Sequence, residues 1–151
     1  MIDLSRILNI ASALLFVVGI VGMIYGLQEL FLVAYLDEEL IGVTASEIGV
    51  FSQNLLDSIK LKSHFEGLYM LSTALIFCVI SLIPYRKGEK WAWYTLSVIG
   101  GLAVFGQIIL IYIGVAGAIS PSYLLPLAIV IVTLWIVGLA LPAKEILSKT
   151  S

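Results

Sequence analysis

Four long runs of apolar residues constrain this chain more than any other feature of its sequence. An α-helix needs about 20 residues to cross a hydrocarbon core of roughly 30 Å. None of the four runs contains a charged side chain, and they cover residues 7–27, 67–83, 91–117 and 123–141. They are continuously apolar, whereas the strands of a membrane barrel alternate between apolar and polar residues. We therefore predict an all-α fold, an integral membrane four-helix bundle that forms a single domain over residues 1–151.

The overall composition agrees with a membrane protein and excludes several other classes. Apolar residues make up 61% of the chain and charged residues 12%, whereas soluble domains average roughly 45–50% and roughly 25%. The formal net charge of −2 leaves no basic surface for nucleic acid. A single cysteine, Cys78, and a single histidine, His64, are too few for a zinc or di-iron site. We expect no metal and no cofactor.

The positions of the basic residues predict how the chain crosses the membrane. If the four helices alternate in direction, Lys60 and Lys62 fall on one side of the membrane. The other six Lys and Arg residues fall on the side of both termini, at Arg6, Arg86, Lys87, Lys90, Lys144 and Lys149. Basic residues are in excess in the cytoplasmic loops of membrane proteins. We therefore place both termini in the cytoplasm and the protein in the plasma or inner membrane.

Residues 28–66 form the one long segment outside the predicted helices, and a loop of this length is expected to fold. Thr44-Ala45-Ser46-Glu47 fits a capping box at the start of a helix. An apolar stripe at helical spacing follows, made of Ile48, Phe51, Leu55 and Ile59. We therefore predict short amphipathic helices on the outer rim of the bundle. The apolar stripe either covers the helix ends or docks a partner.

His64 and Glu66 are candidates for ligand binding or acid/base chemistry at the outer rim, because imidazole and carboxylate groups commonly act as acids and bases and the two residues lie at a similar depth. Residues two apart on a helix do not face each other, which favours a structural role for both. Gln107 is the strongly polar residue near the middle of the third run. Its amide predicts either a hydrogen bond between helices or a contact with a ligand. We assign no catalytic residue.

The interior of the apolar runs contains few side chains that could take part in a reaction. No Asp, Glu, Lys, Arg or His lies in the middle of a run, whereas proton-coupled transporters normally keep an ionisable group there. Small residues recur at four-residue spacing and allow close helix approach, either within the bundle or between copies of the chain. These pairs are Gly22 and Gly26, Ser97 and Gly101, and Gly114 and Ala118.

The turn between the second and third runs is the most distinctive local sequence. Pro84 is expected to end one helix, Gly88 to supply a positive φ, and Trp91 and Trp93 to anchor the next helix at the membrane interface. Residues 86–93, Arg-Lys-Gly-Glu-Lys-Trp-Ala-Trp, follow an Arg-x-Gly-Glu-x-Trp-Ala-Trp pattern.

This pattern resembles the cytoplasmic turn of uncharacterised small four-span prokaryotic membrane proteins. The resemblance extends to the Thr-Ala-Ser-Glu helix start and the region of His64, over about residues 40–95. It implies the four-span topology and carries no activity.

Three functions from different classes are consistent with these observations. The favoured hypothesis is a non-enzymatic accessory or scaffold subunit of a membrane complex. Its partners would be the lipid bilayer and either further copies of the chain or other membrane subunits, held through the apolar stripe and the Gly22 and Gly26 face. The second is a lipid- or sterol-like ligand-binding protein, or an isomerase, with a site near His64, Glu66 and Gln107. A small transporter is the third.

Overall fold

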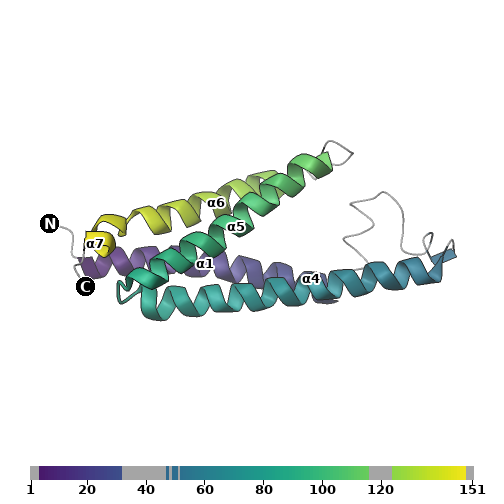
Figure 1. Cartoon of the computed structure of the whole chain (residues 1–151), viewed down its shortest axis with the longest axis horizontal. Coiled ribbons are helices and arrows are strands. Elements are labelled where there is room, and N and C mark those ends of the chain that lie inside the picture. The colour runs from purple at the N-terminus through teal and green to yellow at the C-terminus, as the bar shows by residue number, and fades with distance from the viewer. Residues whose placement is uncertain (1–3, 32–46, 48, 51, 116–123, 149–151) are drawn as a thin grey trace. The chain divides into compact units, whose positions relative to one another are not determined.

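The computed structural model describes residues 4–31, 47, 49–50, 52–115 and 124–148, and these residues are helical apart from short turns (Figure 1). The described residues form no strand, so the predicted all-α fold class is confirmed over this part of the chain. A π-helical turn, η1 (Ser81–Tyr85), follows directly after the second long helix. The α-helices are α1 (Leu4–Phe31), α4 (Gln53–Ile80), α5 (Lys90–Val115), α6 (Leu124–Ala140) and α7 (Ala143–Ser148).

Three stretches of the described residues are long and apolar enough to cross a membrane: Leu4–Phe31, Gln53–Tyr85 and Pro126–Ser148. At most 28% of the most apolar part of each stretch is buried within the chain, so most of this apolar surface must be covered by something else. By length and composition the chain is therefore a membrane protein. α5 coincides with the third predicted run, and its crossing of the membrane stays a prediction.

α4 begins at Gln53 rather than at residue 67, so the prediction of separate amphipathic helices in this part of the outer loop is wrong. Residues 53–66 contain neither proline nor glycine, and nothing in them stops a helix. The Leu55 backbone N–H donates to Ser52 Oγ over 3.3 Å, which satisfies one of the free N–H groups at the helix start. Thr44, Ala45 and Ser46 lie outside the described residues.

Pro84 does not end the second helix as predicted. Proline has no N–H to donate to the carbonyl four residues earlier, and here the chain widens into η1 and continues to Tyr85. The helix then ends in a turn where Gly88 N–H donates to Tyr85 O over 2.8 Å and Glu89 N–H donates to Pro84 O over 3.2 Å. This pair of bonds is a Schellman motif, which requires a left-handed residue. The predicted positive φ of Gly88 is confirmed at 74°.

The contacts within the chain group into two units, which are described separately. The larger unit comprises Met1–Ile20 and Leu75–Ser151, and the smaller unit is Val21–Ala74. The predicted single domain over residues 1–151 stays a prediction.

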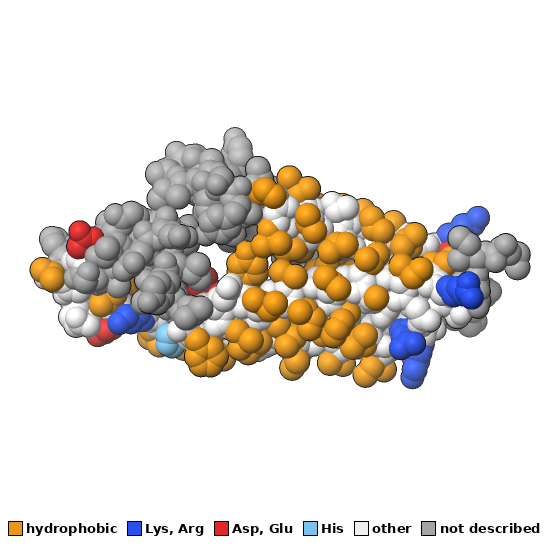
Figure 2. Space-filling view, turned by 180° about the vertical axis from the view of Figure 1, so that it is seen from behind, with side chains coloured by type: hydrophobic (Ala, Val, Ile, Leu, Met, Phe, Trp, Pro, Cys, Tyr) orange, Lys and Arg blue, Asp and Glu red, His pale blue; other side chains and the backbone are white. Residues whose placement is uncertain are grey.

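The larger unit has a hydrophobic core to which each of its helices contributes. On α1 the core residues Leu8, Ala11 and Leu15 recur at the three- and four-residue intervals of one helix face. The other buried members are Phe77, Tyr85, Ala92, Leu96, Leu139 and Ile146. Hydrophobic side chains cover much of the visible surface of the molecule, and the Lys and Arg side chains of the larger unit gather at its end (Figure 2).

In the smaller unit, the backbones of α1 and α4 approach closely at Gly26 and Gly67. A Cβ atom on Gly26 would lie 2.7 Å from the Leu71 backbone nitrogen and 3.0 Å from Gly67 O. A Cβ atom on Gly67 would lie 2.8 Å from both Gly26 O and the Leu30 backbone nitrogen. Each glycine therefore makes room for the backbone of the other helix, which is how small residues act between membrane helices.

We expect Gly26→Ala to lower the stability of the protein in mild detergent by about 1–3 kcal/mol, because the added methyl group meets backbone atoms that cannot rotate away. The measurement is the thermal unfolding midpoint of the purified protein. Gly106→Ala is the matched control, since a Cβ atom on Gly106 has no described neighbour within 4 Å. Equal midpoints for the two variants would contradict the close approach of the helices.

Candidate functional site

His64 and Glu66 both lie on α4 and are exposed, in the smaller unit. The structure does not pair them, because Glu66 Oε1 lies 3.5 Å from Lys62 Nζ, one helical turn away. This ion pair is exposed and contributes little stability. The third candidate, Gln107, lies on α5, and its side chain is outside the described residues. The predicted ligand site at the outer rim therefore stays a prediction.

The candidate interface residues fall into two groups. Leu55 is exposed on α4 and Ile59 is half-buried there, whereas Ile48 and Phe51 lie outside the described residues. The apolar stripe as a docking surface stays a prediction. Gly22 and Gly26 instead face α4 of the same chain, since a Cβ atom on Gly22 would lie 3.1 Å from Ala74 Cβ.

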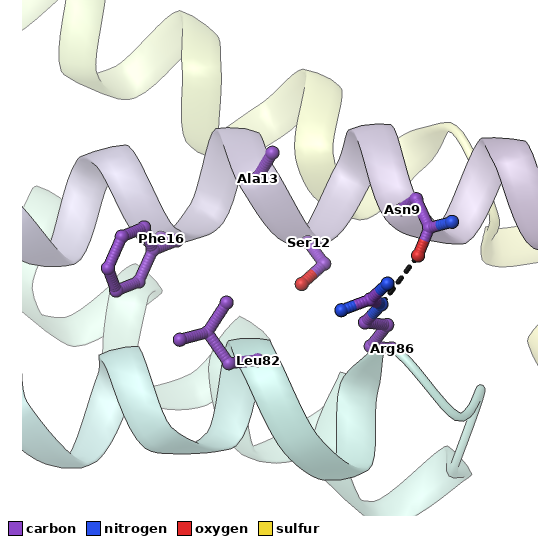
Figure 3. Close-up of a pocket in the computed structure, with 6 residues that line it drawn as sticks. All are labelled: Asn9, Ser12, Ala13, Phe16, Leu82 and Arg86. Atoms are coloured by element: carbon purple, nitrogen blue, oxygen red, sulfur yellow. Dashed lines mark hydrogen bonds between the residues drawn. The ribbon is translucent and has the colours of Figure 1, made fainter.

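The larger unit contains a groove that was not predicted (Figure 3). It has a volume of about 250 Å³ and is open to one side. Four of its lining residues come from α1 at the intervals of one helix face, and two come from η1 and the residue that follows it. The lining residues are Asn9, Ser12, Ala13, Phe16, Leu82 and Arg86.

One end of this groove is polar and carries a positive charge. Arg86 Nε donates a hydrogen bond to Asn9 Oδ1 over 2.6 Å, and both side chains are exposed. Among the described residues, no carboxylate forms an ion pair with Arg86. The bond to Asn9 holds the guanidinium group beside α1 and leaves its positive charge at the groove entrance.

A second hydrogen bond, from α1 to η1, holds the wall of the groove in place. Ser12 Oγ donates to Ser81 O over 2.6 Å, and both serines are buried. Beyond this bond the lining is apolar, with Phe16 and Leu82 lying on the side away from Arg86 (Figure 3). The groove therefore joins a cationic, hydrogen-bonding end to an apolar end.

A buried tyrosine links η1, which forms one side of the groove, to α6. Tyr85 Oη donates to Gly138 O over 2.5 Å, and Tyr85 is fully buried. The helical donor for Gly138 O would be the N–H of residue 142, which is proline and has none. The tyrosine hydroxyl thus satisfies a carbonyl group that the helix itself cannot.

Sequence reasoning missed this groove, although a signal for it exists. Asn9, Ser12, Ala13 and Phe16 share one face of an apolar helix, so two polar residues interrupt a surface that otherwise suits lipid. In the sequence, Arg86 stands in the predicted cytoplasmic turn, far from these four residues. That the two sets of residues meet follows from the packing of η1 on α1 and could not be seen in either segment alone.

The fold and this groove define a helical membrane protein with a cationic groove at one end of its larger unit. Comparison with protein-family models, with curated proteins and with solved structures finds no match for this chain. The resemblance of residues 86–93 to the turn of small four-span membrane proteins therefore stays a prediction.

We expect Tyr85→Phe to destabilise the protein by about 1–3 kcal/mol, because it leaves the buried Gly138 carbonyl without a donor. The thermal unfolding midpoint in detergent measures this loss. Tyr94→Phe is the matched control, since Tyr94 lies on α5 and is exposed. A midpoint unchanged in both variants would show that the hydroxyl does not stabilise the fold.

Proposed function

We propose that the protein is a non-enzymatic accessory or scaffold subunit of a membrane complex, built as a four-helix membrane bundle. The observation that carries this proposal is the use of the polar side chains inside the larger unit. They donate hydrogen bonds to backbone carbonyl groups of neighbouring elements, as Ser12 does to Ser81 (2.6 Å), Tyr85 to Gly138 (2.5 Å), Trp93 to Leu139 (2.9 Å) and Trp135 to Leu96 (3.2 Å).

Such bonds hold helices together and leave these side chains little capacity to act on a substrate. Leu139 lies in the last turn of α6, where carbonyl groups lack donors from the helix itself. The Trp93 indole N–H supplies a donor to the Leu139 carbonyl group. Ser72, Ser97 and Thr133 donate hydrogen bonds to carbonyl groups of their own helices, as serine and threonine often do within helices. The polar inventory described here thus supports a structural role.

The outer faces of the helices support a role in assembly. Val98, Leu102 and Phe105 lie on one face of α5, and each is at least 60% exposed. In a membrane such a face is covered by lipid chains or by another membrane helix. A subunit of a larger complex would use these faces, together with the apolar stripe, to contact its partners.

The distribution of charge supports the orientation within this proposal. The Lys and Arg side chains of the larger unit gather at its end (Figure 2). If cytoplasmic loops carry the excess of basic residues, this end and both termini lie in the cytoplasm.

Cysteine labelling in intact cells tests the orientation. In a Cys78→Ala background, a cysteine at Lys87 should be protected from membrane-impermeant thiol reagents, and one at Lys62 should react. Both positions are exposed, and Lys87 avoids the positive φ of Gly88. Labelling at position 87 and protection at position 62 would reverse the orientation.

Native mass spectrometry of the complex released in mild detergent tests the function itself. We expect partner chains on the wild-type protein and their loss when Phe51 and Leu55 of the apolar stripe are replaced by serine. The control variants His64→Ala and Glu66→Gln should keep the partners, because the proposal gives these residues no role in assembly.

The opposite pattern would favour a ligand-binding protein or an enzyme at the outer rim. In that case the stripe variant would keep its partners. His64→Ala would lower the activity of the protein by roughly 10²–10⁴-fold, as expected for the loss of an acid/base group.

A further inference from the structure

We propose that the groove of the larger unit binds one anionic glycerophospholipid. Arg86 and Asn9 contact the lipid phosphate, and part of one acyl chain lies along Ala13, Phe16 and Leu82. This inference requires only that the larger unit lies in a membrane, and it is independent of the assembly role proposed above.

The chemistry of the polar end matches a phosphate group. A guanidinium group binds phosphate oxygens through its fork of N–H donors. Arg86 uses Nε for Asn9, and its terminal nitrogens make no hydrogen bond to another described residue. The bond to Asn9 orients the guanidinium group in advance, which reduces the entropy lost when a phosphate binds.

Neighbouring charges favour an anionic lipid over a neutral one. Lys87 follows Arg86 in the turn and Lys90 begins α5. Lys and Arg side chains gather at this end of the larger unit (Figure 2). Basic pockets between membrane helices attract anionic headgroups, and each basic residue near the surface strengthens this attraction.

The apolar end matches an acyl chain. Asn9 and Phe16 are seven residues apart on α1, which corresponds to roughly 10 Å along the helix. Figure 3 shows Phe16 and Leu82 flanking the same part of the groove, away from Arg86. A lipid whose phosphate lies at Arg86 therefore has its first chain carbons beside these two residues.

The size of the groove also favours a lipid over a free solute. Its volume of about 250 Å³ is below the roughly 300–1,000 Å³ of pockets that enclose a small molecule. It is open to one side, so the rest of a bound lipid would remain in the bilayer. Free phosphate has no apolar group that could pack against the apolar half of the groove.

The proposal is tested with the full-length protein in non-ionic detergent, titrated with phosphatidylglycerol or phosphatidylcholine of the same chain composition. Native mass spectrometry counts the bound lipids. We expect one phosphatidylglycerol to bind more tightly than phosphatidylcholine. Arg86→Gln should weaken phosphatidylglycerol binding about fivefold. It should weaken phosphatidylcholine binding less, because the choline cation already offsets the attraction of that phosphate to the cationic end of the groove.

Lys87→Gln is the matched control for charge, because Lys87 is exposed, adjacent in sequence and outside the groove lining. Lys87 adds only to the general attraction, so Lys87→Gln should weaken phosphatidylglycerol binding less than Arg86→Gln does. Arg86→Lys keeps the charge but loses the fork, and it should retain an intermediate preference. Equal effects of Arg86→Gln and Lys87→Gln, or equal binding of the two lipids by the wild type, would overturn the proposal.

The acyl-chain part is tested by filling the groove. Ala13→Phe should abolish binding of phosphatidylglycerol, whereas Val17→Phe, at an exposed position on α1 outside the lining, should not. Ala13→Leu is the milder variant if Ala13→Phe fails to fold, as judged by its thermal unfolding. Unchanged binding in the folded variant would overturn the proposal.

Inorganic phosphate distinguishes a lipid from a soluble ligand. Millimolar phosphate should not displace phosphatidylglycerol from the wild type, because it gains nothing from the apolar lining. Displacement by phosphate alone would identify a soluble anion as the ligand and would overturn the lipid assignment.

Discussion

The hydrogen bond from Tyr85 Oη to Gly138 O supplies the donor that Pro142, two residues beyond the end of α6, cannot provide. No water can replace a missing donor in the hydrocarbon of a membrane. An unpartnered carbonyl group there would lower the stability of the fold by several kcal/mol. Tyr85 is fully buried in the core of the larger unit, and it thereby fixes η1 against α6. The same element, η1, carries Leu82, which lines the groove.

Pro84 shapes the same region through the same chemistry. Since it cannot donate to the carbonyl four residues earlier, the helix widens into η1. Ser12 Oγ then bonds to Ser81 O, and Arg86 Nε to Asn9 Oδ1, so two side-chain bonds join η1 and its following residue to α1. The helix thus continues past Pro84 to Tyr85 with altered geometry, and the next residue, Arg86, lies beside the polar Asn9 of α1.

The surfaces proposed for assembly and for lipid binding are different parts of the chain, so the two proposals are compatible with each other. The groove is confined to the end of the larger unit where cations gather, whereas large apolar side chains such as Leu102 and Phe105 are exposed along α5. An anionic lipid held at Arg86 would fix the depth of the subunit in the bilayer. The exposed helix faces would then meet partner helices at a defined height.

The sequence alone determined the helical class, the positions of the apolar runs and the positive φ of Gly88, because helix length, apolar composition and turn chemistry are local properties. It did not determine where α4 starts or that the helix continues past Pro84. Both depend on local preferences for helical backbone conformation, which are weak. The tertiary structure alone decided that Gly26 opposes Gly67 and that Arg86 meets Asn9. Contacts between residues far apart in the chain follow from packing, which no single segment encodes.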